Sequence, residues 1–131
     1  MRLQNKVALI TGAANGIGRA TALAFSARGA KVMVVDKDAA GAERTAGTIQ
    51  QQGGQAKFHI ADVTKSADVQ AYVKATLDAF GSIDCFFNNA SIEGKVSATA
   101  NCDEAMFDAV IGVNLKSVFL DLRHVLPEMN R

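Results

Sequence analysis

Short apolar runs alternate with segments of helical periodicity along most of the chain. The apolar runs predict β-strands at residues 7–10, 31–35, 56–60 and 83–87. Between them, apolar residues recur at helical spacing and predict helices at about 16–28, 39–52 and 65–80. A loop is expected over 88–100, and helical segments follow it towards residue 126. The order is therefore a repeated strand followed by a helix.

This alternation predicts an α/β fold in one domain, residues 1–131. Right-handed crossovers between successive strands give a Rossmann-like, doubly wound parallel sheet with the strand order 3-2-1-4. Tyr72 belongs to the apolar stripe of the third helix and is expected in the core. Asn101 and Glu104 have the spacing of a capping box, which predicts the start of the last helical region there.

Composition and charge narrow the classes of partner. With 131 residues, 49% hydrophobic and 21% charged, the chain can form a real core. The net charge of +1, without a basic cluster, argues against nucleic-acid and membrane-surface binding. The polar first residues and the short apolar run behind them do not resemble a signal or membrane segment. We therefore expect a cytoplasmic protein whose partners are small molecules or proteins.

The cysteines and histidines give no sign of a metal or redox site. Cys85 and Cys102 are not at CxxC spacing, and His59 and His124 have no ligand partner at suitable spacing. Cys85 falls in an apolar strand, where a free thiol behaves as a small hydrophobic group. We assign none of these four residues a chemical role.

A glycine-rich turn directly follows the first strand and precedes a helix. Gly12 allows a sharp exit from the strand, Gly16 keeps a side chain away from an anion, and Gly18 lets the helix pack closely. The unpaired N–H groups and the dipole of a helix N-terminus favour a pyrophosphate. The spacing is not that of the standard dinucleotide fingerprint, so a merely flexible turn is the alternative.

An acidic residue ends the second strand at the position where a ribose would be held. The carboxylate of Asp36 can accept hydrogen bonds from a ribose diol and repels a 2′-phosphate. This favours NAD over NADP, although the adjacent Lys37 weakens the preference, and an Asp-Lys pair is also common at strand ends. Polar residues follow the third and fourth strands as well, so all candidates gather at one edge of the sheet.

Four motifs, in order, resemble the short-chain dehydrogenase/reductase family over essentially the whole chain. Residues 11–18 (Thr-Gly-x-x-x-Gly-Ile-Gly) are similar to its cofactor turn, and Asp62-Val63 to its adenine-contacting pair. Asn88-Asn89-Ala90 is similar to its strand-end motif, and Asn114 to its helix asparagine. The resemblance implies a cofactor site formed by Gly12, Asn15, Gly16, Ile17, Gly18, Asp36, Asp62, Val63, Asn89, Ala90 and Ser91.

The resemblance also implies individual roles. Asp62 would accept a hydrogen bond from the adenine amino group, the N–H of Val63 would face adenine, and Asn89-Ala90 would line the adenosine through main-chain atoms. Asn114 would support a catalytic lysine through its main chain and a water. Asp62 could instead cap a helix entry, and Asn114 could be a helix polar residue that finds a buried partner.

The sequence departs from the family in two places. Ser91 replaces a glycine and would bring a hydroxymethyl group near the nicotinamide ribose. The family's fifth strand, catalytic serine and Tyr-x-x-x-Lys helix find no match. We therefore expect an NAD(P)-binding domain incomplete at its C-terminal end. It would be the cofactor half of an oxidoreductase acting on a small alcohol or carbonyl compound, and inactive alone.

A sheet truncated before its fifth strand would have an open edge. Ile83, Phe86 and Phe87 would lie there, and a homo-oligomer or another partner is expected to cover them. The alternative function is a non-catalytic nucleotide-binding or interaction module that pairs through this edge.

Overall fold

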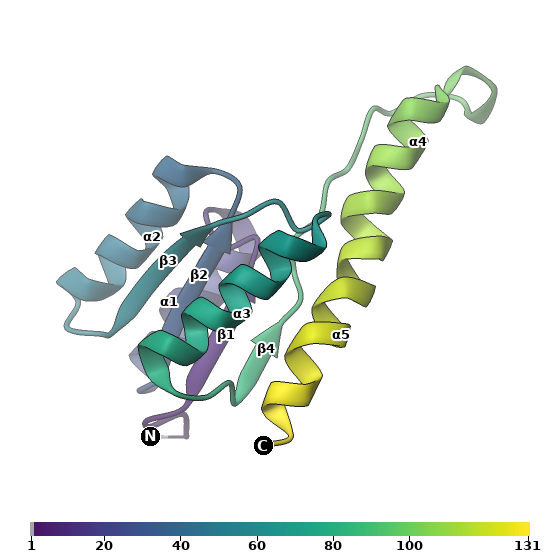
Figure 1. Ribbon diagram of the computed structural model, residues 1–131. Coiled ribbons are helices and arrows are strands. Elements are labelled where there is room, and N and C mark those ends of the chain that lie inside the picture. The colour runs from purple at the N-terminus through teal and green to yellow at the C-terminus, as the bar shows by residue number, and fades with distance from the viewer. Residues whose placement is uncertain (1) are drawn as a thin grey trace.

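The computed structural model describes residues 2–131 and has three layers, with a parallel sheet between two layers of helices (Figure 1). The sheet order is β3-β2-β1-β4, as predicted. Its strands are β1 (Val7–Thr11), β2 (Lys31–Asp36), β3 (Ala56–Ile60) and β4 (Cys85–Phe87). The predicted α/β class and doubly wound topology are confirmed.

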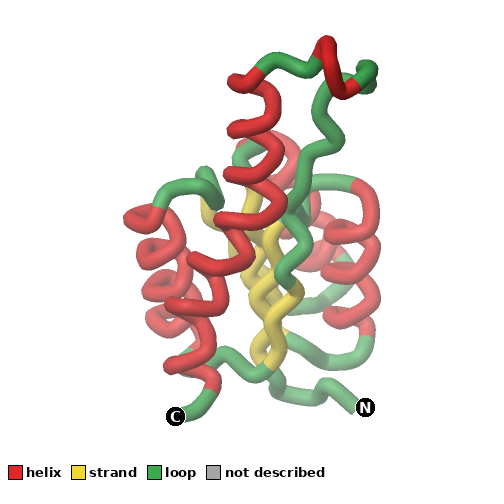
Figure 2. Tube along the Cα trace, turned by 90° about the vertical axis from the view of Figure 1, so that its right-hand side faces the viewer, coloured by secondary structure: helices red, strands yellow, loops and turns green. Residues whose placement is uncertain are grey.

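Two helices cover each face of the sheet, seen edge-on in Figure 2. The first pair is α1 (Gly16–Ala27) and α2 (Ala39–Gln51), and the second is α3 (Ser66–Phe80) and α5 (Ser117–Met129). Successive side chains of a strand point to opposite faces. In β1, Ile10 therefore joins the core under α1 and α2, whereas Leu9 joins the core under α3 and α5.

The fourth strand is shorter than the predicted range 83–87. Asp84 interrupts the apolar run, and its carboxylate accepts a hydrogen bond of 2.8 Å from the N–H of Val7. The N–H of Asp84 in turn donates to the Val7 carbonyl oxygen at 2.9 Å. This side chain takes the place of a strand partner at the start of β1, so regular pairing begins only at Cys85.

The predicted capping box at Asn101 and Glu104 is wrong. Asn101 ends a 3₁₀ turn, and helix α4 (Glu104–Ile111) begins after Asp103. The carboxylate of Asp103 accepts a hydrogen bond of 2.7 Å from the N–H of Met106. The N-cap is therefore the aspartate directly before the helix, whose carboxylate reaches a free N–H of the first turn, and not the asparagine two residues earlier.

Helix α4 continues through a π-helical segment, η2 (Gly112–Lys116), into α5. Together they form one long helix whose α4 end projects beyond the sheet, with the preceding loop alongside (Figures 1 and 2). No side chain of α4 is buried. Among the described residues, no helix is long and apolar enough to cross a membrane.

The edge of β4 opposite β1 pairs with no strand among residues 2–131. Phe86 and Phe87 are half-buried, because they pack against the two cores, and Ile83 is buried. Six of the exposed large apolar side chains lie instead along the long helix, in a stripe formed by Phe107, Ile111, Leu115, Phe119, Leu122 and Leu126. The helix, rather than the strand, therefore carries the larger apolar surface.

Candidate functional site

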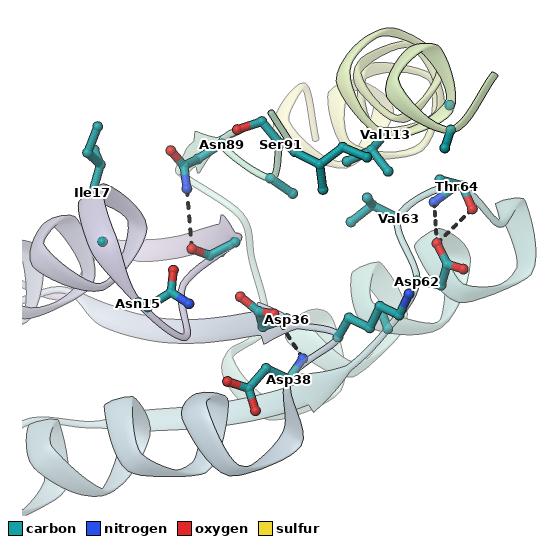
Figure 3. A pocket seen from close by; sticks show the side chains of 18 of the residues that line it. Asn15, Ile17, Asp36, Asp38, Asp62, Val63, Thr64, Asn89, Ser91 and Val113 are labelled. Carbon is teal, nitrogen blue, oxygen red and sulfur yellow. Dashed lines mark hydrogen bonds between the residues drawn. The ribbon is translucent and has the colours of Figure 1, made fainter. Parts of the chain in front are cut away.

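A cavity of about 1130 Å³ lies at the carboxyl ends of the strands (Figure 3). Its walls come from the turn after β1, the ends of β2, β3 and β4, and one side of α4 and η2. Ten predicted site residues line it: Gly12, Asn15, Gly16, Ile17, Asp36, Asp62, Val63, Asn89, Ala90 and Ser91. Gly18 and Asn114 are not among its lining residues.

The turn after β1 opens onto the cavity. Gly12 and Gly16 have φ angles of +67° and +56°, which side chains rarely adopt. A Cβ on Gly16 would have nothing within 4 Å, so the space above it is open. Asn15 is the N-cap of α1, but its side chain caps no N–H of the first turn. The N-terminus of α1 therefore presents donors that an anion can accept.

Gly18 does not line the cavity but packs against the turn. It is buried, and a Cβ there would stand 2.2 Å from the Gly12 carbonyl oxygen and 2.6 Å from Nδ2 of Asn89. Such contacts are shorter than any side chain tolerates, so only glycine lets α1 approach the turn this closely. The structure thus gives Gly18 the packing role that the sequence predicted.

Thr11 and Asn89 tie the turn to the end of β4. The hydroxyl oxygen of Thr11 accepts hydrogen bonds from the N–H groups of Asn89 (3.0 Å) and Ala90 (3.1 Å). The Asn89 side chain donates to the carbonyl oxygens of Thr11 and Gly12, at 3.1 and 3.3 Å. These two N–H groups are therefore already used, and the main chain of residues 89–90 offers a ligand its carbonyl oxygens.

Asp36 is held in place by the main chain around it. Its Oδ2 accepts a hydrogen bond from the N–H of Ala14 (3.0 Å), and its Oδ1 accepts one from the N–H of Asp38 (2.9 Å). Each carboxylate oxygen can accept a further bond. The side chain faces the cavity beside Asp38 (Figure 3), whose own carboxylate caps α2 by accepting a hydrogen bond of 3.1 Å from the N–H of Gly41. The end of β2 thus places two carboxylates at the cavity, with Lys37 between them in sequence.

Asp62 forms a turn with Thr64 and does not cap α3. Its Oδ1 accepts hydrogen bonds from the hydroxyl (2.6 Å) and the N–H (3.0 Å) of Thr64. These bonds lower the pKa of Asp62, with smaller help from Lys37 and Lys65. The charged form therefore persists well below neutral pH, while both Thr64 bonds leave Oδ2 available to a ligand in the cavity, which Asp62 lines together with Val63.

Asn114 lies in the π-helical segment and binds the main chain of Ile92. Its Oδ1 accepts from the N–H of Ile92, and its Nδ2 donates to the carbonyl oxygen of the same residue, both at 2.8 Å. The alternative expectation of a buried partner is wrong, because Asn114 and Ile92 are both exposed and the partner is a loop backbone. The pair fixes the loop next to Ser91, which is exposed and faces the cavity.

One wall of the cavity is formed by residues that no sequence motif had indicated as site residues. Asp108, Ala109, Gly112 and Val113 line it from the long helix. They contain no motif, and their position depends on the path of the loop before α4. The nearest hint was Asn114, whose pairing with Ile92 brings this helix over the cavity.

Comparison with known proteins gives the family of this fold and site. Residues 6–131 match the short chain dehydrogenase family. The chain belongs to this family. The resemblance seen in the sequence motifs is therefore confirmed, including its extent over nearly the whole chain.

Individual family members agree in sequence and structure. Levodione reductase of Leifsonia aquatica is 45% identical over 130 residues, which are 98% of this chain and 49% of that protein. The structure of 3-ketoacyl-(acyl-carrier-protein) reductase from Brucella melitensis, complexed with NADH, has a TM-score of 0.91 at 44% identity, covering 96% of this chain and 51% of that one. A metagenomic short-chain oxidoreductase in complex with NADP has a TM-score of 0.92 at 33% identity, covering 98% and 58%.

These family members are larger proteins. The chain spans about half the length of the relatives it matches. Members of the family are seen with NADH and with NADP, so nicotinamide dinucleotides are the cofactors of this family.

Proposed function

We propose that this chain supplies the cofactor-binding half of an NAD-dependent oxidoreductase that transfers hydride between nicotinamide and an alcohol or carbonyl compound. The observation that carries the proposal is the cavity, where a glycine turn, a helix N-terminus and two aspartates from different strands meet. The open space above Gly16 and the uncapped first turn of α1 fit a pyrophosphate.

The two ends of the cavity suit the two ends of a dinucleotide. Asp36 would accept hydrogen bonds from the adenosine ribose, and Oδ2 of Asp62 would accept one from the adenine amino group. The main-chain carbonyl groups at Asn89 and Ala90 would line the adenosine, and the hydroxyl of Ser91 would lie near the nicotinamide ribose. When bound, the nicotinamide supplies or accepts the hydride.

The charges at the end of β2 support NAD over NADP. Asp36 and Asp38 both line the cavity there, and Lys37 is the only basic residue among the lining residues. A 2′-phosphate would place about two more negative charges beside these carboxylates, which is unfavourable. We expect NADH to bind more tightly than NADPH.

The chain alone is proposed to be inactive. Reduction of a carbonyl needs a group that donates a proton to the substrate oxygen. The sole tyrosine, Tyr72, is fully buried and donates its hydroxyl to Asp121, outside the cavity lining. It cannot reach a substrate in the cavity. Asn114 stays a proposed supporting residue for a catalytic lysine.

Titration of NADH fluorescence against the purified chain tests the proposal. We expect saturable binding, weaker binding of NADPH, and no turnover of alcohols or ketones. Replacing Asp62→Asn keeps an oxygen for the Thr64 bonds but turns the acceptor directed towards adenine into a donor. This change is expected to weaken NADH binding about ten-fold or more.

The matched control is Asp78→Asn, which removes an exposed carboxylate on α3. It should leave NADH affinity unchanged, and thermal melts should show that both variants fold. Failure of NADH to bind at millimolar concentration would contradict the proposal. Equal losses of NADH affinity in Asp62→Asn and Asp78→Asn would show that Asp62 has no specific role in binding.

The apolar stripe on the long helix supports a second proposal, that two copies of this chain pair through it. Its six side chains run along one continuous helix, and a two-fold axis would make such a stripe self-complementary. Large contiguous apolar patches are rare on the surface of monomers. Pairing through the open edge of β4, as an interaction module would use, is the competing arrangement.

Light scattering of the stripe variant Phe119→Glu tests this assembly. Phe119 is 58% exposed and lies mid-stripe, so a charge there should convert a dimer into a monomer. Val96→Glu is the control, because Val96 is 87% exposed but lies on the loop. A wild-type mass of one chain, or a dimer that survives Phe119→Glu, would contradict pairing through the stripe.

A further inference from the structure

A buried carboxyl group lies between α3 and α5, outside the cavity lining. Asp121 of α5 is fully buried, and its Oδ1 accepts a hydrogen bond from the hydroxyl of Tyr72 on α3, which is also fully buried. Its Oδ2 has no hydrogen-bond partner among the described residues. A charged carboxylate here would lose its hydration in exchange for a single hydrogen bond, so the neutral acid is favoured.

No basic side chain of α3 compensates a charge at Asp121. Lys74, the basic residue of this helix, forms an exposed ion pair with Asp78 at 2.6 Å. The remaining acidic group, Asp68, accepts a hydrogen bond from the N–H of Asp62. The side of α3 that faces Asp121 offers the Tyr72 hydroxyl alone as a donor.

The ionisable groups of α5 and η2 are also directed elsewhere. His124 has its Nε2 at 3.3 Å from the hydroxyl oxygen of Ser66, and Glu128 is paired with the arginine three residues later. Lys116 and Arg123 are exposed. Burial without a counter-charge raises the pKa of Asp121 to about 7.

The strand beside α5 offers Asp121 no charge either. At the end of β4, the Asn88 side chain donates to the Val118 carbonyl oxygen of α5 at 3.4 Å, and its own Oδ1 is a buried acceptor without a partner among the described residues. Cys85 of β4 packs into the core on the other face of the sheet, under α1 and α2, and its thiol, whose pKa is raised by burial, is neutral at physiological pH. An ionised Asp121 would therefore add a negative charge to a region that already lacks donors.

Helix α5 is continuous with one wall of the cavity. The segment η2, which runs directly into α5, carries Gly112 and Val113, which line the cavity, and Asn114, which fixes the loop through Ile92. A change in how α5 packs on α3 would therefore act on the wall and on the loop beside Ser91 through this one helix.

We propose that Asp121 is a proton-controlled latch between α3 and α5. The neutral carboxyl group holds α5 against Tyr72, and its ionisation as the pH rises weakens this packing and loosens the cavity wall. Cofactor affinity then falls at alkaline pH. The link to cofactor affinity rests on the proposed function, whereas the latch itself does not.

Tyrosine fluorescence reports the ionisation of Asp121 directly. The chain has one tyrosine and no tryptophan, so its emission reports Tyr72, the group that donates to Asp121. Between pH 5 and 9 we expect a single transition with a midpoint of about 7 in the folded chain. Asp121→Asn keeps the shape of the side chain but cannot ionise, and its emission should be flat over this range.

Two control variants separate the latch from other titrations. His124→Gln removes the imidazole of α5 and should retain the transition. Asp78→Asn removes an exposed carboxylate of α3 and should retain it too. A transition that persists in Asp121→Asn, or one that His124→Gln abolishes, would overturn the latch.

NADH titrations at pH 6 and pH 8.5 test the connection to the cavity. Wild type should bind about five-fold more weakly at the higher pH, which is typical of coupling between sites, and Asp121→Asn should bind equally at both. If NADH binds at neither pH while the tyrosine transition is present, the proposed function fails and the latch stands. If NADH binds with the same pH dependence in both proteins, the connection fails and the proposed function stands.

Discussion

Replacing Gly18→Ala is expected to lower the free energy of unfolding by about 3 kcal/mol and to abolish cofactor binding. The added Cβ would stand 2.2 Å from the Gly12 carbonyl oxygen and 2.8 Å from its carbonyl carbon. Backbone atoms cannot turn away as a flexible side chain can, so α1 or the turn must move. Chemical denaturation measures the loss of stability, and NADH titration measures the loss of binding.

Two other glycines supply controls for this substitution. Gly47 lies in α2, and a Cβ added there would have no atom within 4 Å, so Gly47→Ala should stabilise the chain by about 0.5–1 kcal/mol. Gly16→Ala meets no atom either but keeps a φ of +56°, and should cost about 1 kcal/mol in backbone strain. A Gly18→Ala protein as stable as Gly47→Ala would show that close packing is not what requires glycine at this position.

The second large effect is expected for Asp121→Asn, and it depends on pH. In the unfolded chain an aspartate ionises above about pH 4, whereas folded Asp121 keeps its proton up to about pH 7. The folded state therefore binds one more proton between these values. This extra proton stabilises the folded state fully below pH 4, and the stabilisation is lost as the pH rises to 7. The free energy of unfolding thus falls by about 4 kcal/mol in total, and it changes no further through this group above pH 7.

Asparagine has no proton to lose, so the two proteins should differ mainly in slope. The stability of Asp121→Asn relative to wild type is expected to increase from pH 4 to pH 7 and to level off above it. Urea denaturation at pH 4.5, 6, 7 and 8 measures this difference, in which the titrations of other groups cancel. Parallel stability curves for the two proteins would contradict a raised pKa at Asp121.

Much of the fold could be predicted from the sequence, because burial on both faces of a parallel sheet leaves a strong local pattern. The runs that became β1 and β2 are nearly continuous and bounded by turns, whereas β3 alternates apolar and polar residues, and the strand order followed from the handedness of crossovers. The cavity position followed as well, since ligands gather where parallel strands end.

Apart from the helix cap at Asp103, the features that the sequence did not predict depend on side chains whose partners are distant in the chain. Asp84 satisfies the N–H of Val7 and so delays β4, and nothing near residue 84 reveals this partner. The helix wall at Gly112 and Val113 faces the cavity because of a long-range pairing at Ile92. Asp121 lies on a helix face whose burial depends on a tyrosine of another helix, Tyr72.

The tie between Thr11 and Asn89 has a consequence for the order of folding. It joins groups separated by 78 residues along the chain, so the loop that closes it contains most of the protein. Contacts of such high sequence separation form late, because closing the loop costs entropy before any contact repays it. We therefore expect the glycine turn to reach its final shape only after β4 has joined the sheet. A nucleotide that binds at the turn would therefore stabilise chains in which β4 is paired with β1 over chains in which it is not.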